Sequence, residues 1–163
     1  MDGARLRGTL AWVTVALAVA LADQGTKHLI GALLNPGEGL RITGFFNLVL
    51  VFNRGAAFSL LSDAPGWQRE LFAAIALVAS VVIVMLIVRN ASARLFCAGL
   101  ALILGGALGN LWDRVALGYV VDFLDFHAAG YHWPAFNLAD SAITVGAALV
   151  ILDGFLARRP TAA

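Results

Sequence analysis

The sequence predicts an all-α membrane protein with four transmembrane helices and a small β element outside the bilayer. Of the 163 residues, 61% are hydrophobic and 13% are charged, whereas soluble domains are about 45–50% apolar and about 25% charged. The apolar residues also gather in long uncharged stretches of the kind that crosses a bilayer core of about 30 Å. Such a composition excludes intrinsic disorder, and the length suits a single domain over residues 1–163.

Three of the four transmembrane helices follow directly from their apolar stretches. Residues 71–88 and 95–112 are each 18 residues without a charge. Residues 138–157 carry charges only near their two ends, at Asp140 and Asp153. A helix needs roughly 20 mostly apolar residues to span the hydrocarbon core, so all three stretches are predicted to cross the membrane.

The first apolar stretch has two interpretations. Gly8–Ala22 is uncharged but only 15 residues long, and Arg5 and Arg7 precede it. Ala20–Ala22 resembles the small-residue cleavage site of a signal peptide, which is the alternative. A helix that continues to Ile30 reaches spanning length, so we expect a retained transmembrane helix over residues 9–30.

The basic residues predict the orientation. Four spans place both termini on one side, with six basic residues in short segments there: Arg5, Arg7, Arg89, Arg94, Arg158 and Arg159. The five on the other side are Lys27, near the outer end of the first span, and four arginines spread over two long connections, residues 31–70 and 113–137: Arg41, Arg54, Arg69 and Arg114. Because lysine and arginine concentrate in short cytoplasmic segments, both termini are expected to be cytoplasmic and both long connections extracytoplasmic.

The first long connection predicts a β-hairpin that rests on the membrane surface. Residues 45–52 are rich in β-formers, Asn53–Gly55 is turn-like, and residues 56–61 are suited to return. Five aromatic residues are expected near the outer interface, as in the aromatic belts of membrane proteins: Trp67, Trp112, Tyr119, Tyr131 and Trp133.

The distribution of charge narrows the function. A net charge of +1 gives no electrostatic footprint for nucleic acid. The span centres carry no ionisable group, which argues against a transporter. Eight of the ten acidic residues lie at or beyond the outer helix ends: Asp23, Glu38, Asp63, Glu70, Asp113, Asp122, Asp125 and Asp140. A site at the outer edge of the bilayer is therefore expected.

Metal, serine and cysteine chemistry are poorly supported. The three histidines, His28, His127 and His132, share no helical turn and form no H-E-x-x-H motif. No serine has the context of a nucleophile elbow. Cys97 is the only cysteine, so it forms no internal disulfide, and it lies in an apolar span where packing is expected. No metal or organic cofactor is predicted.

The glycines and polar residues of the third span each have two interpretations. Gly105–Gly109 resembles a phosphate loop, but no P-loop lysine follows, so close helix packing is favoured. Asn110, Asp113 and Arg114 form either an ion-paired polar helix end or a group that orients neighbouring carboxylates.

Paired carboxylates remain as the chemistry of the site. Two aspartates at close range share one proton, so that one acts as general base on a water and the other as acid toward an amide. Any two of five aspartates qualify: Asp23, Asp113, Asp122, Asp125 and Asp140. Asp140 also fits the third position of a helix capped by Asn137, and Asp125 fits a solvated loop charge. Composition and position leave the pair open.

Five motifs, in order along the chain, carry a family resemblance. They are Asp23-Gln24-Gly25-Thr26-Lys27, Asn53-Arg54-Gly55-Ala56-Ala57-Phe58, Gly105-Gly106-Ala107-Leu108-Gly109-Asn110-Leu111-Trp112-Asp113-Arg114, Val120-Val121-Asp122-Phe123 and Phe136-Asn137-Leu138-Ala139-Asp140-Ser141-Ala142-Ile143. The chain resembles the bacterial lipoprotein signal peptidases (signal peptidase II), from the first span to the last. Each motif alone is weak, but five in this order on a four-span chain are highly specific.

The resemblance implies a membrane aspartyl endopeptidase at the outer face of the bacterial inner membrane. Its substrates are diacylglyceryl-modified prolipoproteins, cut on the amino side of the lipidated cysteine. The resemblance makes Asp122 and Asp140 the catalytic residues. It implies substrate-binding or positioning roles for Asp23, Lys27, Asn53, Arg54, Gly55, Asn110, Arg114 and Asn137. The hairpin corresponds to the family's β-cradle.

The resemblance also implies the partners of the chain. Cyclic peptide antibiotics of the globomycin type occupy the same site, membrane phospholipid surrounds the spans, and we expect a monomer. Because the helix dipole favours an ionised Asp140, the proton of the pair is expected on Asp122. The alternative function is a non-catalytic lipid- or peptide-binding membrane protein whose carboxylates serve only as polar caps.

Overall fold

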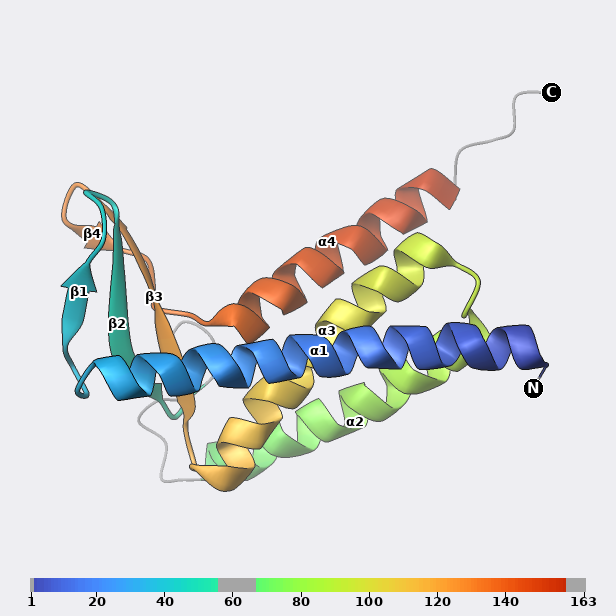
Figure 1. The fold of residues 1–163 in the computed structure, drawn as a ribbon, viewed down its shortest axis with the longest axis horizontal. Helices are drawn as coiled ribbons and strands as arrows, with labels where there is room; N and C mark the ends of the chain where they lie inside the picture. Colours follow the sequence, from blue (N-terminus) through green and yellow to red (C-terminus); the bar gives the residue numbers. More distant parts are fainter. Residues whose placement is uncertain (1, 56–66, 158–163) are drawn as a thin grey trace.

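The structure, a computed structural model, describes residues 2–55 and 67–157. Four helices run alongside one another and a small sheet lies across one end of the bundle (Figure 1). The helices are α1 (Gly3–Leu33), α2 (Trp67–Arg89), α3 (Arg94–Ala116) and α4 (Leu138–Ala157). Each is long and apolar enough to cross a membrane, so the chain has the architecture of a multi-pass membrane protein.

The four helices cover the four apolar stretches that were predicted to span the membrane. Helices α1, α2 and α3 are longer than their predicted spans at both ends, and α4 has the predicted bounds. The added residues include polar and aromatic ones that a bilayer interface accommodates, such as Trp67, Gln68, Arg69 and Glu70 at the start of α2. At the start of α1, for example, the Asp2 side chain accepts a hydrogen bond from the Arg5 backbone N–H at 2.7 Å, which caps the helix.

Helix α3 is the centre of the bundle. Of its most apolar window, 56% is buried inside the protein, against 17% for each of the other three helices. Its glycines allow this central position, because an added Cβ at Gly105 would lie 2.6 Å from the Ala16 carbonyl oxygen of α1. On the α4 side, Gly99 and Gly146 face each other in the same way. The packing interpretation of the glycines is therefore confirmed.

The sheet is antiparallel and has the order β1 (Gly39–Arg41), β2 (Phe46–Asn53), β3 (Val120–Ala128), β4 (Tyr131–His132). A β element between the first two helices is thus confirmed, with β2 over the predicted β-formers. The expected return strand over residues 56–61 lies outside the described residues. Within the described part, β2 pairs with β1 and with β3, and β3 comes from a connection that was read from the sequence only as a loop.

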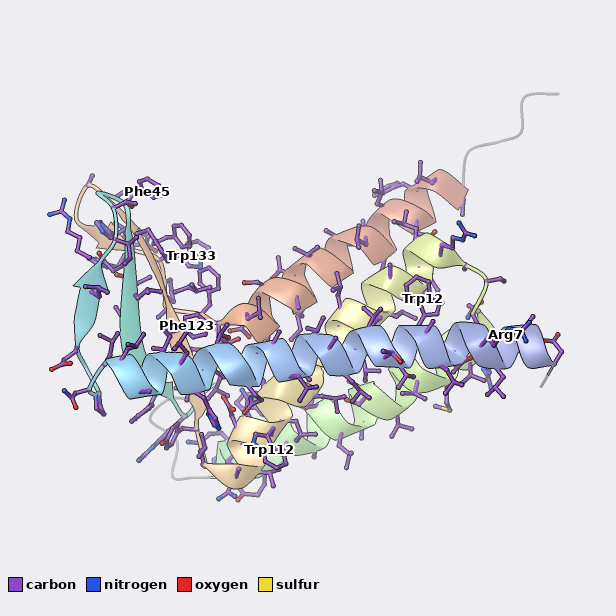
Figure 2. All side chains as sticks on the ribbon, viewed as in Figure 1. Arg7, Trp12, Phe45, Trp112, Phe123 and Trp133 are labelled. Carbon is purple, nitrogen blue, oxygen red and sulfur yellow. The ribbon has the colours of Figure 1, made fainter. Side chains whose placement is uncertain are left out.

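An apolar cluster fixes the sheet to the helix ends. Ile30 of α1, Leu50 of β2, and Val121 and Phe123 of β3 are buried together, with Leu138 of α4 packed against them. Trp112 and Trp133 lie at this end of the molecule, whereas Arg7 and Trp12 lie toward the other end (Figure 2). The arrangement agrees with an aromatic belt at the sheet end.

At the opposite end, α1 is fastened to the turn between α2 and α3. The Trp12 Nε1–H donates to the Ala91 carbonyl oxygen at 3.1 Å, and an Arg5 Nη2–H donates to the Arg89 carbonyl at 3.2 Å. Cys97 is fully buried beside this turn and its thiol lies 3.0 Å from the Asn90 carbonyl, in agreement with a packing role.

Helix packing gives the first prediction. Gly105→Ala places a methyl group against the backbone of α1 and the branched side chain of Val19, so the two helices must separate. We expect a loss of about 2–3 kcal/mol in unfolding free energy, measured as a lower thermal midpoint in detergent. Gly154→Ala is the matched control, because no atom lies within 4 Å of its Cβ; it is expected to stabilise slightly. Equal midpoints for the two variants would contradict the packing role.

Candidate active site

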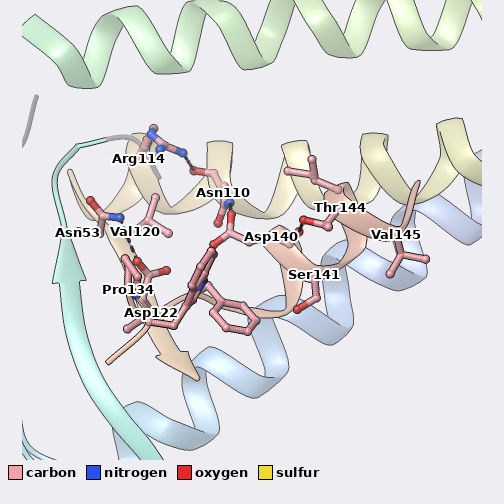
Figure 3. Close-up of a pocket in the computed structure, with 14 residues that line it drawn as sticks. Asn53, Asn110, Arg114, Val120, Asp122, Pro134, Asp140, Ser141, Thr144 and Val145 are labelled. Atoms are coloured by element: carbon pink, nitrogen blue, oxygen red, sulfur yellow. Dashed lines mark hydrogen bonds between the residues drawn. The ribbon is translucent and has the colours of Figure 1, made fainter. Parts of the chain in front are cut away.

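A cavity of about 500 Å³ opens between α3, α4, the end of β2 and the segment 133–136 (Figure 3). Of the five candidate aspartates, Asp122 and Asp140 are the two that line it, together with Asn53, Asn110 and Arg114. The rest of the wall is largely apolar: Val120, Trp133, Pro134, Ala135, Phe136, Ile143 and Val145. The cavity thus combines a carboxylate pair with a surface that suits an apolar ligand.

Asp122 is the more buried member of the pair. It lies on β3, is 2% exposed, and accepts hydrogen bonds from the side-chain amides of Asn137 at 2.7 Å and Asn53 at 3.0 Å. Burial raises the pKa of Asp122 to about 7, because it penalises the charged form more than the two amides stabilise it, and the nearby Asp140 charge adds to the rise. Near neutral pH this carboxyl is poised between its two protonation states.

Asp140 lies in the first turn of α4 and caps that helix. Its Oδ2 accepts from the Asn137 backbone N–H at 3.4 Å, while Asn137 Oδ1 accepts from the Asp140 backbone N–H at 2.9 Å. This reciprocal pair is a capping box. The other oxygen, Oδ1, accepts from the Asn110 amide at 2.8 Å. Two N–H donors, the Asn137 backbone and the Asn110 side-chain amide, thus hold the Asp140 carboxyl at the N-terminus of α4.

Two asparagines connect the aspartates. Asn137 is fully buried, and its Nδ2 donates to Asp122 Oδ1 and to Asn110 Oδ1, the latter at 3.1 Å. Asn110 Nδ2 donates in turn to Asp140. The orientation of each amide is decided by a partner that can only donate. For Asn137 that partner is the Asp140 backbone N–H, which requires the amide oxygen on its side and turns the nitrogen toward Asp122.

For Asn110 the deciding partner is the ammonium group of Lys27. Lys27 is 3% exposed and its Nζ lies 2.7 Å from Asp23 Oδ2, 2.8 Å from Asp113 Oδ2 and 3.0 Å from Asn110 Oδ1. Three acceptors satisfy the three donors of an ammonium group. Asn110 therefore presents its oxygen to Lys27 and its nitrogen to Asp140.

The two carboxylates that pair with Lys27 also tie secondary-structure elements together. Asp23 Oδ1 accepts from the Ala139 backbone N–H at 2.9 Å, so a side chain of α1 caps α4. Asp113 Oδ2 accepts from the Val121 backbone N–H at 3.1 Å, which links α3 to β3. Gln24 Nε2 donates to Asp113 Oδ1 at 2.8 Å. Asp113, one of the five candidate aspartates, therefore lies in the ion-paired network and not in the cavity. Gln24 was not predicted as a site residue, although it lies within the first motif.

Arg114 and Asn53 form the edge of the cavity nearest α2. Arg114 donates to the carbonyl oxygens of Asn110 at 3.2 Å and Gly55 at 3.3 Å, and its guanidinium lies over the Phe72 ring at 5.5 Å. Asn53 Oδ1 accepts from the Gly55 backbone N–H at 2.9 Å. Arg54 is exposed. The structure therefore gathers nearly all of the expected positioning residues around the aspartates, with Arg54 at the periphery.

Asp125 lies apart from this site. It accepts from the Asn47 amide at 2.8 Å and lies 2.9 Å from His132 Nδ1. Burial alone would raise the pKa of Asp125, but the hydrogen bonds from His132 and Asn47 outweigh it and the pKa is lowered. Asp122 and Asp125 belong to one strand yet have opposite shifts, which sets Asp122 apart as the functional candidate.

Comparisons with known proteins agree on one family. A family model described as signal peptidase (SPase) II matches residues 15–156. The chain is 58% identical over 147 residues to a lipoprotein signal peptidase of Paraburkholderia phytofirmans, which covers 90% of this chain and 86% of that protein. It is 56% identical over 144 residues to a lipoprotein signal peptidase of Cupriavidus necator, covering 88% and 82% respectively.

Two solved bacterial membrane enzyme structures have a similar fold. One superposes with a TM-score of 0.82 at 30% identity over 94% of both chains. The other has a TM-score of 0.79 at 31% identity, covering 91% of this chain and 94% of that one.

The Lys27 contacts predict a large loss of stability on substitution. Lys27→Met leaves the buried Asp23 and Asp113 carboxylates without their cation, and we expect a loss of about 3–5 kcal/mol, measured by thermal unfolding in detergent. The control is Arg41→Met, because Arg41 is exposed and donates to the Thr43 carbonyl on its own strand edge; a change within about 0.5 kcal/mol is expected there. A comparably small effect at Lys27 would refute the role of its ammonium group.

Proposed function

The chain belongs to the signal peptidase II family and is a peptidase, and from this premise we propose its reaction. It removes the signal peptide from diacylglyceryl-modified prolipoproteins by hydrolysis on the amino side of the lipidated cysteine. Asp122 and Asp140 activate the attacking water. The observation that carries this proposal is that these two aspartates, drawn from five, share one cavity in which their environments differ.

The difference between the two environments assigns their roles. Asp140 is the general base, since its carboxyl accepts hydrogen bonds from the Asn137 backbone N–H at the start of α4 and from the Asn110 amide. Asp122 is the general acid, since burial and the charge of Asp140 keep its proton near neutral pH.

The reaction follows with its protons balanced. Asp140 removes a proton from water as the water oxygen attacks the scissile carbonyl carbon, and Asp122 gives its proton to the carbonyl oxygen. When the resulting gem-diol collapses, Asp140 passes its proton to the leaving nitrogen and Asp122 regains one from the gem-diol hydroxyl. The C–N bond breaks and both carboxyls return to their starting states.

The position of the cavity supports a lipidated substrate. Ile143 and Val145 extend its wall along α4, within a helix apolar enough to span the membrane. The acyl chains of the substrate stay in lipid beside α4 while the scissile bond reaches the aspartates at the sheet end. Asn53, Gly55 and Arg114 form the part of the rim that contacts the peptide, and Arg54 contacts substrate or phospholipid headgroups.

The proposed setting is the bacterial inner membrane. Residues 31–70 and 113–137 are extracytoplasmic, both termini are cytoplasmic, and the cavity opens at the extracytoplasmic face. Cyclic peptide antibiotics of the globomycin type inhibit by occupying the cavity, and the protein acts as a monomer. The excess of arginines in the short segments opposite the sheet supports this orientation.

Cleavage of a diacylglyceryl-modified prolipoprotein in detergent tests the proposal. Asp122→Asn and Asp140→Asn each remove an acid–base group and are expected to lower kcat by at least about 10²–10⁴-fold. Asp125→Asn is the matched control: it makes the same chemical change on the same strand, outside the cavity, and should cleave within about twofold of the unsubstituted protein.

Mass spectrometry of the products locates the cut. If the folded Asp122→Asn and Asp140→Asn proteins both still cleave, the assignment of the pair is wrong. If the unsubstituted protein binds the substrate and never cleaves it, the non-catalytic binding function replaces the proposed one.

The raised pKa of Asp122 predicts the alkaline limb of the pH profile. The general acid must be protonated, and its pKa is about 7. The value of kcat/KM is therefore expected to fall above about pH 7 and to approach a tenfold loss per pH unit. Thermal midpoints over the same pH range separate loss of the proton from unfolding. A kcat/KM that stays flat from pH 6 to 9 would rule out Asp122 as the proton donor.

A further inference from the structure

The far end of the sheet carries two histidines opposite each other. His127 of β3 pairs with His132 of β4 in the antiparallel register. The Trp133 backbone N–H donates to the Phe126 carbonyl at 2.8 Å, so the bonded pair is Phe126–Trp133 and the next pair, His127–His132, is of the non-hydrogen-bonded kind. Side chains of such pairs approach each other most closely in an antiparallel sheet.

The two imidazole rings lie against each other on one face of the sheet. Their centroids are 4.9 Å apart and their planes differ by 26°. Among the described residues, no hydrogen bond engages a ring nitrogen of His127, and the His132 side chain is 56% exposed. The His132 ring is thus open to solvent, and the His127 ring beside it is half-buried.

The Asp125 carboxylate orients one of the rings. His132 Nδ1 lies 2.9 Å and 3.0 Å from the two Asp125 oxygens, and the Asn47 amide holds the same carboxylate in place. A carboxylate that accepts from Nδ1–H selects the tautomer in which Nε2 carries the free lone pair. Histidines that bind a metal through one ring nitrogen commonly donate the other ring N–H to a carboxylate, and the Asp125–His132 contact is of this kind.

We propose that His127 and His132 form a two-histidine binding site for a divalent transition-metal ion such as Cu²⁺ or Zn²⁺, with Asp125 as the carboxylate behind His132. Imidazole nitrogen is a preferred ligand of both ions, and Cu²⁺ binds such ligands more tightly than Zn²⁺. Chelation of one ion requires the His127 ring to turn from its stacked position toward Nε2 of His132, while Asp125 keeps the His132 ring in place. Water fills the remaining coordination positions.

The proposed site is a pair and not a larger cluster. No group of three or more histidine, cysteine, aspartate or glutamate side chains suited to a metal ion occurs within residues 2–55 and 67–157. Two protein ligands imply an affinity in the micromolar range and a site exposed to solvent. The site is also separate from the catalytic aspartates, because His127 and Asp125 lie at odd positions of β3 whereas Asp122 is at an even one, on the other face.

A bound ion would connect the two ends of the β3–β4 hairpin beside the cavity. Trp133 directly follows His132 and lines the cavity wall. Because the ion ties His132 to β3, it restrains the start of this wall segment. The inference is independent of the proposed reaction and requires only that the sheet be folded.

Titration of the full-length protein, freed of any polyhistidine tag, tests the site. Isothermal titration calorimetry with Zn²⁺ should give one equivalent bound, and electron paramagnetic resonance with Cu²⁺ should show two imidazole nitrogens. His127→Gln and His132→Gln are each expected to weaken binding by at least tenfold and to leave one imidazole in the Cu²⁺ spectrum. Asp125→Asn should weaken binding by about tenfold, as carboxylates behind metal-bound histidines do.

His28→Gln is the matched control, because His28 is an exposed histidine of α1 outside the sheet. Circular dichroism and thermal midpoints without metal confirm that each variant is folded. Binding that is absent up to millimolar metal, or that survives both sheet-histidine variants or is lost in His28→Gln, overturns the proposal. Unchanged binding in Asp125→Asn overturns the role of the carboxylate.

Discussion

The buried ammonium group of Lys27 is the constraint on which the rest of the structure depends. A charge removed from water in a membrane protein must be paired and fully hydrogen-bonded. Lys27 meets this requirement with acceptors from α1 and α3. Asp23 accepts from a backbone N–H of α4 through its other oxygen, and Asp113 accepts from a backbone N–H of β3 through the same Oδ2 that pairs with Lys27. One cation thereby helps to determine how four elements that carry site residues meet: α1, α3, α4 and β3.

The same contacts prepare the chemistry. Lys27 can only donate, which orients the Asn110 amide, and the N-terminus of α4 can only donate, which orients the Asn137 amide. As a result, the side-chain N–H of Asn110 donates to Asp140 and that of Asn137 donates to Asp122. For Asp140, a helix-capping role and a proposed catalytic role are not alternatives, because the capping box holds the carboxyl group in position at the cavity.

The features that could be predicted from the sequence depend on residues close together in the chain, and the features that could not depend on contacts between residues far apart. The four helices and the strand over residues 46–53 could be predicted because apolar runs and β-formers are local signals. The pairing of β2 with β3 could not, since it joins residues 67 or more apart, from Asn53 with Val120 upward. The choice of two aspartates among five likewise depended on contacts such as Asp23 to Ala139, 116 residues apart. The five motifs selected the pair only through the family resemblance, and Gln24, with no local signal beyond its motif, was missed.

Asp122 and Asp125 show why residue type and spacing were insufficient for this selection. In a helix, residues three apart share a face, and both carboxyls would belong to one acidic surface. In a strand they lie on opposite faces. Asp122 therefore enters a buried cavity beside Asp140, where its pKa rises to about 7, while Asp125 meets donors from Asn47 and His132 that lower its pKa. Because side chains alternate between the two faces of β3, Asp122 lies at the cavity as the proposed acid, whereas Asp125 lies on the other face beside His132. Knowing that residues 120–128 form a strand is therefore what distinguishes the two aspartates.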